Sequence, residues 1–359
     1  EFDLRTLVQA YRTGGKFLFS AFNAFGPKAV ADFFTSQGLD IKVERGGRVF
    51  PVSDDARDVV KTLEHYLRSV GVEVRLGVGV KKILLNNNIV QAVVLADGEK
   101  IIPEKVVIAT GGLSYPLTGS TGDGLKWASD LGHTIEKTIP ALVPLKIKES
   151  WVKSLQGLSL KNVELTAWQN KKKIASRFGE MLFTHFGVSG PIVLDMSKDV
   201  ILARENGVVE LSLNLKPALS KEQLDERIQR DFKKYQNKLF KNSLDELLPQ
   251  KFISVMIDLS GIDPLKPVNS ITKLERKKLV DCLSDLRFSV IGDMGYDVAI
   301  VTSGGVNTKE IDPRTMQSKK IGNLYFAGEM IDVDGPTGGY NLQVAWATGY
   351  LAGESVSKI

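Results

Sequence analysis

Hydrophobic residues in the first 139 positions follow helical and strand-like periods in turn. Residues 28–39 place Val30, Phe33 and Phe34 on one face, which predicts an amphipathic helix. A second helix is expected between Ser53, a residue suited to an N-cap, and Gly71, a residue suited to a helix end. The segments with the β-branched or alternating composition of strands are residues 72–76, 80–85, 89–96 and 105–109. The last of them is continuously apolar, which is typical of a buried strand in a parallel sheet.

The pattern changes at Pro140 and changes back near Gly292. Residues 140–216 alternate strand-like segments, whereas residues 217–291 carry helical signals. The helical signals are capping-box sequences beginning at Ser220 and Ser243, and a third apolar period over residues 270–285. After residue 292, strands at 298–302 and 324–327 precede a C-terminal helix. This order predicts an α/β domain (1–139 and 292–359) interrupted by a β-rich domain (140–216) and a small helical domain (217–291).

Composition is that of an ordinary globular protein. The 359 residues are 43% hydrophobic and 25% charged, which excludes disorder, collagen and coiled coil. No apolar run approaches the roughly 18 residues of a membrane-spanning helix. Cys282 is the sole cysteine and cannot form an internal disulfide, and three histidines do not indicate a dedicated zinc site. We therefore expect a cytoplasmic protein with no metal site and no membrane partner.

Positive charge is concentrated in the middle of the chain. The net charge is +5, with 25 basic and 18 acidic residues between positions 141 and 290. Such an excess would suit nucleic acid or an anionic ligand, but solvated helical surfaces also produce it. Because no stretch interleaves aromatic and basic residues as a base-stacking platform does, we expect no nucleic-acid partner. A nucleic-acid-associated protein that uses this basic segment is kept as an alternative.

Three glycine-rich turns follow predicted strands. They are Thr110–Gly112, Ser303–Gly305 and the segment from Gly328 to Gly339. In open α/β sheets ligands collect at the carboxyl ends of strands, where glycine lets backbone N–H groups approach a phosphate or a flat ring. The N-terminus of a helix beginning near Asn341 would offer further N–H groups and a partial positive charge. One such turn can reflect ordinary turn geometry alone, but three on one sheet predict a shared ligand.

Eight motifs occur in a specific order along nearly the whole chain. They are Gly47–Pro51, Val107–Gly112, Thr118–Gly124, Leu155–Leu160, Phe183–Pro191, Thr302–Val306, Gly328–Gly335 and Gly338–Asn341. Together they resemble the HI0933-like family of predicted NAD(P)/FAD-dependent oxidoreductases, within the flavoproteins that have two dinucleotide-binding domains. The resemblance implies a Rossmann-like α/β domain that binds FAD without a covalent bond. It also implies hydride transfer between the flavin and a small organic substrate, with NAD(P)H as a possible transient reductant.

The resemblance also assigns candidate cofactor contacts. The implied residues are Arg48, Pro51, Val80 (to the adenine), Ala109, Thr110, Gly111 and Gly112 (to the central region), Gly328, Glu329 and Asp334 (to the ribityl and pyrophosphate part), and Gly338, Gly339, Tyr340 and Asn341 (to the flavin). Arg48 could equally be a structural ion-pair partner. For catalysis, His185 in the inserted segment could donate or accept a proton, since the histidine pKa lies near neutrality. The alternative is that His185 hydrogen-bonds to the backbone and holds a tight turn.

The start of the chain departs from the family pattern. Members begin with a strand, a G-x-G-x-x-G turn and a helix, whereas Gly14 and Gly15 here follow no predicted strand and lack a third glycine. We expect this sequence to be part of a longer chain. Were the unit truly lacking, FAD affinity would fall, and a flavin-free binding module would become a second alternative. The substrate and the oligomeric state are not indicated by the sequence.

Overall fold

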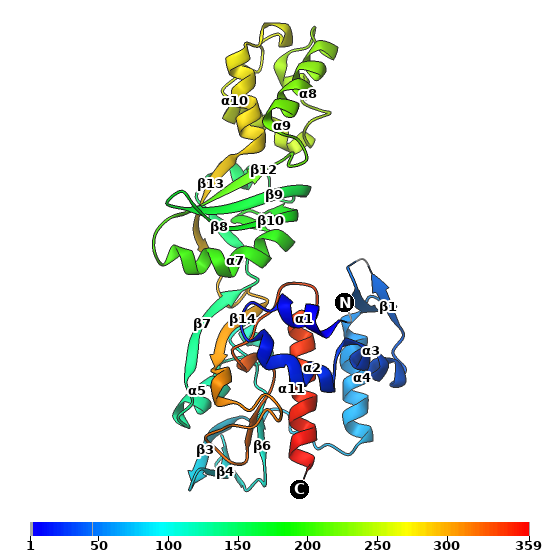
Figure 1. Cartoon of the computed structure of the whole chain (residues 1–359), viewed down its shortest axis with the longest axis vertical. Helices are drawn as coiled ribbons and strands as arrows, with labels where there is room; N and C mark the ends of the chain where they lie inside the picture. Colours follow the sequence, from blue (N-terminus) through cyan, green and yellow to red (C-terminus); the bar gives the residue numbers. More distant parts are fainter. Residues whose placement is uncertain (1–2, 45, 359) are drawn as a thin grey trace. The chain divides into compact units, whose positions relative to one another are not determined.

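A computed structural model describes residues 3–44 and 46–358, and the chain divides into two compact units (Figure 1). Unit 1 comprises Glu1–Pro140 and Ile300–Ile359, and unit 2 comprises Ala141–Ala299. Unit 2 is therefore inserted into the sequence of unit 1. In the described part of the chain, no helix is both long enough and apolar enough to cross a bilayer.

Unit 1 is a mixed α/β unit. Its elements are α1 (Leu4–Ala10), α2 (Phe19–Ala24), α3 (Pro27–Ser36), β1 (Ile41–Glu44), β2 (Arg48–Pro51), α4 (Ala56–Ser69), β3 (Val80–Asn86), β4 (Ile89–Leu95), β5 (Lys100–Ile101), β6 (Val106–Ile108), α5 (Asp123–Asp130), β7 (Ile135–Ala141), β14 (Val301–Val306), β15 (Leu324–Phe326) and α11 (Tyr340–Ser357). Strands β6 and β15 run parallel, with Val106 opposite Leu324 and Ile108 opposite Phe326. Helix α11 packs beside α2 and β15, around buried Leu18, Phe326 and Ala347.

Two local expectations in unit 1 are wrong. The N-cap of α4 is Asp55, whose carboxylate accepts the Arg57 N–H, while the Ser53 hydroxyl donates to Asp58. Asp is at least as good an N-cap as Ser, so both residues were compatible with the sequence. Residues 72–76 do not form a strand, although their apolar residues alternate. Val72, Val74 and Leu76 are all exposed, so a strand here would have no buried apolar face to stabilise it.

The expected turn at Ser303–Gly305 is also wrong, because these residues lie inside β14. Both glycines have positive φ there. A Cβ on Gly304 would lie 2.4 Å from the carbonyl oxygen of Lys137, and one on Gly305 would lie 2.4 Å from that of Met330. The glycines therefore permit close approach of two backbones within a strand, rather than a turn after it.

Unit 2 is built on a closed barrel in the strand order β10-β11-β8-β13-β12-β9. Its elements are β8 (Leu145–Ile147), α6 (Trp151–Ser154), β9 (Ser159–Gln169), β10 (Lys172–Phe183), β11 (Gly187–Ser189), α7 (Pro191–Arg204), β12 (Val209–Asn214), α8 (Lys221–Lys234), α9 (Gln250–Ser260), α10 (Lys273–Ser284) and β13 (Leu286–Asp293). Alternate residues of the long strands point inward, and Leu165, Leu211 and Phe288 are fully buried. Helix α7, which the strand-like composition of this region did not predict, packs against β10.

Helices α8, α9 and α10 form a module between β12 and β13 (Figure 1). The Ser220 capping box is present, but the Ser243 sequence begins no helix, because the Ser243 hydroxyl donates to the carbonyl oxygen of Phe240. Residues 286–293, expected at the end of the helical region, instead form β13 of the barrel. The module and the barrel share one hydrophobic core.

Candidate functional site

The carboxyl end of β6 is joined to β14 by a compact hydrogen-bond network. The Thr302 hydroxyl oxygen lies 2.8 Å from the backbone nitrogen of Leu113 and 3.1 Å from that of Ser114, and it accepts both N–H groups. The Thr302 N–H in turn donates to Glu329 Oε1 over 2.9 Å. The predicted segments Thr110–Gly112 and Gly328–Glu329 therefore lie together, with Thr302 as the link.

Gly112 lies in the tightest part of this network. A Cβ at Gly112 would lie 2.4 Å from Thr302 Oγ1 and 2.7 Å from Glu329 Oε1, which leaves no space for a side chain. Gly111 has φ of +73°, a left-handed conformation that favours glycine. The backbone here can adopt its path only with glycine at both positions.

Two further polar groups follow β6 and β15. The Thr110 hydroxyl is buried and has no hydrogen-bond partner among the described residues. Burial raises the pKa of Glu329, although hydrogen bonding from Thr302 acts in the opposite direction. A partly buried carboxyl group is an acceptor of the type that binds the hydroxyl groups of a ribityl chain or a ribose.

The N-terminus of α11 is formed by Gly339, with φ of +94°. A Cβ at Gly339 would meet no described atom within 4 Å, so the backbone faces open space. Because the N-cap residue has no side chain, it cannot cap the first N–H groups of the helix. The Asn341 side chain holds the preceding loop, since its Oδ1 accepts the Gly335 N–H and its Nδ2 donates to the Gly335 carbonyl oxygen. Only the backbone of Asn341 is thus available for the predicted role.

The other predicted cofactor residues lie in different settings. Asp334 is buried and accepts the Ser303 hydroxyl over 2.8 Å, which ties the loop before α11 to β14. Gly328 donates its N–H to the Thr348 hydroxyl of α11. Ala109 is exposed directly after β6, and Val80 begins β3, where it pairs with Leu95.

The remaining candidates lie in or beside the lining of a mostly apolar cavity of about 190 Å³. Pro51, Gly338, Gly339 and Tyr340 line it. Arg48 extends beside Gly338, since its Cδ would lie 3.9 Å from a Cβ at that glycine. The nearest carboxylate, that of Glu44, is 4.0 Å from Arg48 Nη2, and half of the Arg48 side chain is exposed. An exposed pair at this distance contributes little to stability.

His185 lies at the exposed tip of the turn between β10 and β11. The turn is held by Thr184, whose backbone N–H donates to the Gly187 carbonyl oxygen and whose hydroxyl accepts the Gly187 N–H. His185 itself packs edge-on against Phe186. Its side chain makes no hydrogen bond within the described residues, so Thr184 and not His185 holds this turn.

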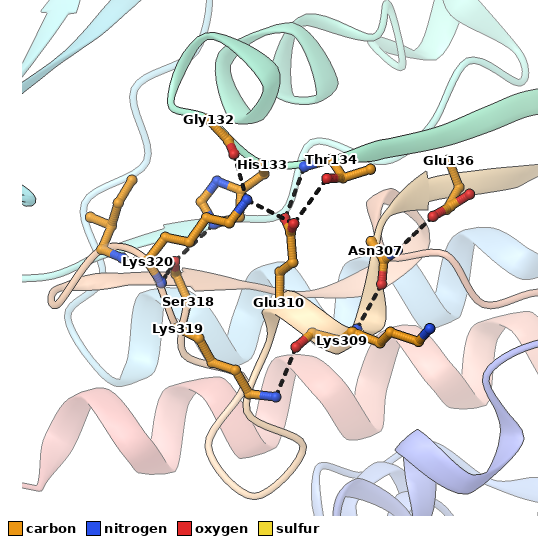
Figure 2. Close-up of polar contacts among 11 residues, drawn as sticks. Gly132, His133, Thr134, Glu136, Asn307, Lys309, Glu310, Ser318, Lys319 and Lys320 are labelled. Carbon is orange, nitrogen blue, oxygen red and sulfur yellow. Dashed lines mark hydrogen bonds and ion pairs between the residues drawn. The ribbon is translucent and has the colours of Figure 1, made fainter.

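A polar cluster in unit 1 surrounds His133 and Glu310 (Figure 2). His133 is buried, its Nε2 lies 2.8 Å from the Ser318 hydroxyl, and its Nδ1 has no hydrogen-bond partner among the described residues. Glu310 accepts the Thr134 N–H and the Lys320 ammonium group. Burial opposes the charged form of Glu310, but these hydrogen bonds hold its pKa at about 2.

We expect His133 to make unit 1 less stable as the pH falls from 7 to 5. Burial lowers the pKa of folded His133 below its usual value of about 6.5, and Lys320 adds to this effect while Glu310 opposes it. The unfolded chain therefore binds more protons, so the contribution is complete above about pH 6.5 and declines below it, by up to about 1.4 kcal/mol per pH unit. His133→Gln should flatten urea-unfolding stability over this range, whereas exposed His65→Gln should not. An unchanged slope in His133→Gln would contradict the assignment.

Residues 1–355 match the family model described as the HI0933-like protein Rossmann domain. The chain is 32% identical over 335 residues to the 3-dehydro-bile acid delta(4,6)-reductase of Clostridium scindens, covering 93% of this chain and 81% of that protein. It is also 32% identical over 326 residues to the ribosomal RNA dihydrouridine synthase of Haemophilus influenzae, covering 90% of this chain and 78% of that protein.

A solved structure of a 3-ketosteroid-delta4-(5alpha)-dehydrogenase from Rhodococcus jostii is similar to 99% of this chain and 83% of its own, with 13% identity and a TM-score of 0.48. The family match confirms the resemblance and the Rossmann-like α/β fold class that the sequence predicted. The chain therefore belongs to the HI0933-like family and is an FAD-dependent oxidoreductase.

Proposed function

We propose that unit 1 binds FAD between the Gly112–Glu329 network and the N-terminus of α11, and that the protein transfers a hydride to or from a small organic substrate. The N-terminus of α11 carries this proposal, because Gly339 leaves open space in front of uncapped N–H groups. Its loop is tied through Asp334 and Ser303 to Thr302, and through Thr302 to Glu329. One continuous hydrogen-bonded framework thus supports both parts of the proposed site.

The residues present fit such a cofactor. FAD, when bound, supplies the ring that accepts or donates the hydride. Thr110 would line the cofactor through its backbone after β6, because its hydroxyl is buried against Gly124. The Glu329 oxygen not used by Thr302 would accept from a hydroxyl group. The helix N–H groups at Tyr340 and Asn341 would stabilise negative charge on an anionic oxygen. Arg48, whose guanidinium group is weakly paired, would add positive charge at the same end.

The remaining predicted residues keep their proposed roles. Val80 would contact the adenine, and Ala109, Gly111, Gly112, Gly328, Pro51 and Gly338 would line the cofactor. Asp334 would act through the loop that it fixes. His185, exposed and without a hydrogen-bond partner among the described residues, would donate or accept a proton in the reaction. NAD(P)H would act as a transient reductant.

An absorbance spectrum from 300 to 550 nm, recorded on the protein in its native full-length form, tests this function. We expect flavin bands that heat releases into solution, and bleaching of those bands by NADH or NADPH under anaerobic conditions. Protein that stays colourless after incubation with FAD would favour a flavin-free binding module and would refute the oxidoreductase function.

A second candidate function is the reduction of a base in RNA. Two similar proteins are named ribosomal RNA dihydrouridine synthases. In the helical module, Arg230, Lys233 and Lys241 form no ion pair with any described residue, and Lys238 lies over the ring of Tyr235 at 4.1 Å. These side chains would contact phosphates. Lys234, by contrast, pairs with Glu246.

If RNA is the substrate, replacing Lys233 and Lys238 together by alanine should weaken RNA binding about tenfold at 0.1 M salt and flatten its salt dependence. Gel-shift assays with a fragment of ribosomal RNA at several salt concentrations would measure both effects. Lys81→Ala with Lys82→Ala, on exposed residues of β3, is the matched control. Equal affinities for the two double variants would exclude this surface as an RNA site.

A further inference from the structure

Thr302 in β14 uses nearly all of its hydrogen-bonding capacity inside the polar network. The residue is almost completely buried. Its hydroxyl oxygen accepts the backbone N–H groups of Leu113 at 2.8 Å and Ser114 at 3.1 Å, and these two bonds occupy both of its lone pairs. The hydroxyl hydrogen is therefore left to donate, and the acceptors beside it are Ser114 Oγ at 3.0 Å and the Glu329 carboxylate.

Glu329 depends on Thr302 for its hydrogen bonds. Its Oε1 accepts the Thr302 N–H over 2.9 Å, and among the described residues Thr302 is the only hydrogen-bond donor to this carboxylate. Burial raises the pKa of Glu329, and the hydrogen bonds from the backbone and the side chain of Thr302 lower it. Thr302 thus favours the ionised form of a carboxyl group that its surroundings would otherwise keep neutral.

No charged neighbour shares this control over Glu329. Strand β14 and helix α11 make the main contacts with its turn, Gly328–Met330, and β14 and residues 109–114 contain no ionisable side chain. The ionisable side chains of α11 and of the loop that follows the turn are Asp332, Asp334, Tyr340, Tyr350 and Glu354. The Glu329 pKa is shifted by burial and by Thr302, and not by a charge on any of these groups.

Thr302 also fixes the spacing between the ends of two other strands. Leu113 and Ser114 follow the turn after β6, and Glu329 follows β15, so the hydrogen bonds of Thr302 connect both strand ends to β14. Gly112 is packed between the two partners, because a Cβ there would lie 2.6 Å from Thr302 Cβ and 2.7 Å from Glu329 Oε1. A displacement of Thr302 would therefore move the turn and the carboxylate together.

We propose that Thr302 is a positioning residue of the cofactor site, whose hydroxyl oxygen fixes the Leu113–Ser114 backbone and whose two donors hold Glu329 as an ionised acceptor for a cofactor hydroxyl group. This inference rests on the proposed function, because the hydroxyl group belongs to FAD. Thr302 acts through Glu329 and does not itself touch the cofactor. An ionised carboxylate accepts a hydrogen bond about twice as strongly as a neutral group does, so FAD affinity should follow the protonation of Glu329.

Titration of FAD into the full-length protein freed of flavin, between pH 5 and pH 9, tests the proposal. In wild type we expect FAD affinity to fall as the pH falls through the pKa of Glu329. In Thr302→Val the midpoint of this fall should move up by about one pH unit, with about tenfold weaker binding between the two midpoints. Thr302→Ser keeps the hydroxyl and should restore the wild-type midpoint, whereas Glu329→Gln should lack this pH dependence.

Thr348→Val is the matched control for Thr302→Val. The Thr348 hydroxyl is buried in α11, accepts the Gly328 N–H over 2.9 Å and donates to the carbonyl oxygen of Val344. The substitution therefore removes a buried hydroxyl one residue from the Glu329 backbone without removing a donor to its carboxylate. We expect weaker FAD binding with an unchanged midpoint. Equal midpoint shifts in the two valine variants, or an unshifted midpoint in Thr302→Val, would refute the positioning role.

Urea unfolding of the flavin-free protein separates this proposal from the proposed function. Because the folded pKa of Glu329 is raised above its unfolded value of about 4.5, the folded chain binds more protons, and stability falls as the pH rises from about 4.5 through the folded pKa. Thr302→Val should extend this fall to higher pH, Glu329→Gln should remove it, and Thr348→Val should leave it in place. These slopes without any FAD binding would overturn the proposed function alone. FAD binding with equal slopes in wild type and Thr302→Val would overturn the role of Thr302 alone.

Discussion

Replacing Gly339 by leucine is expected to weaken FAD binding by more than about 100-fold, equivalent to about 2.7 kcal/mol. The backbone at Gly339 has φ of +94°, where a residue with a Cβ incurs about 1–2 kcal/mol of strain. The leucine side chain would also extend into the open space that faces this glycine, where we place the cofactor. Flavin absorbance after gel filtration, and titration of FAD into protein freed of flavin, would measure the loss.

The matched control for Gly339→Leu lies in the same helix. Gly349 is exposed in α11, has no positive φ, and would meet no described atom with a Cβ, so Gly349→Leu should bind FAD normally. Because a Cβ at Gly339 meets no atom either, Gly339→Leu should remain folded, as circular dichroism can confirm. Normal FAD content in folded Gly339→Leu would rule out the N-terminus of α11 as the cofactor site.

Replacing Phe183 by alanine should destabilise unit 2 by about 3–5 kcal/mol, the usual effect of deleting a fully buried aromatic ring. Phe183 is completely buried in β10, with its ring 6.2 Å from that of Trp151 and 5.9 Å from that of Phe252. The ring therefore supports the barrel and α9 at once. Urea unfolding followed by tryptophan fluorescence would report the change, with Trp151 and Trp168 as reporters in unit 2.

Phe178, in the same strand, provides the comparison for Phe183→Ala. Its side chain is 64% exposed, so Phe178→Ala should change stability by no more than about 0.5 kcal/mol. Since Phe183 lies in unit 2 and the proposed cofactor residues lie in unit 1, flavin content of folded Phe183→Ala should stay normal. Equal stability of the two variants would mean that the core around Phe183 is not formed as described.

Much of the fold could be predicted where local signals and burial agree. Helix α10 has its capping box at Thr272, and α4 and α11 end or begin at glycines that the sequence marks clearly. Prediction failed where contacts between residues far apart in the sequence determine the secondary structure. Helix α7 buries only the face with Ile192, Met196 and Val200. Its helical period is weak in the sequence because further apolar residues, such as the exposed Leu202, lie off that face. Strand β13 was assigned to the helical region because only its barrel partners, far away in sequence, identify it.

The candidate site shows the same division. The motifs identified Gly112 and Gly339. A Cβ at Gly112 would lie 2.4 Å from Thr302 Oγ1, whereas Gly339 has the space for a Cβ but a φ of +94°, which favours glycine. Thr302 lies in one of the eight motifs, but its link from Leu113 to Glu329 requires segments almost 200 residues apart to meet. The cavity could not be predicted, because its walls combine α1, α3, the β1–β2 hairpin, α4 and α11, whose apolar residues look like ordinary core.

The insertion of the helical module between β12 and β13 has a consequence for the order of folding. Leu213 pairs with Leu286, so closing the barrel joins residues about 70 positions apart, and an unstructured loop of that length carries a substantial closure entropy. Helices α8 and α10 are tied antiparallel by Lys221 with Asp281 and by Asp225 with Arg276, which brings the two ends of the module together. These pairs join residues 60 and 51 positions apart, so packing of the module already covers most of the closure entropy before β13 pairs with β12. Packing of the helical module therefore brings β12 and β13 close together, which favours their pairing and the closure of the barrel.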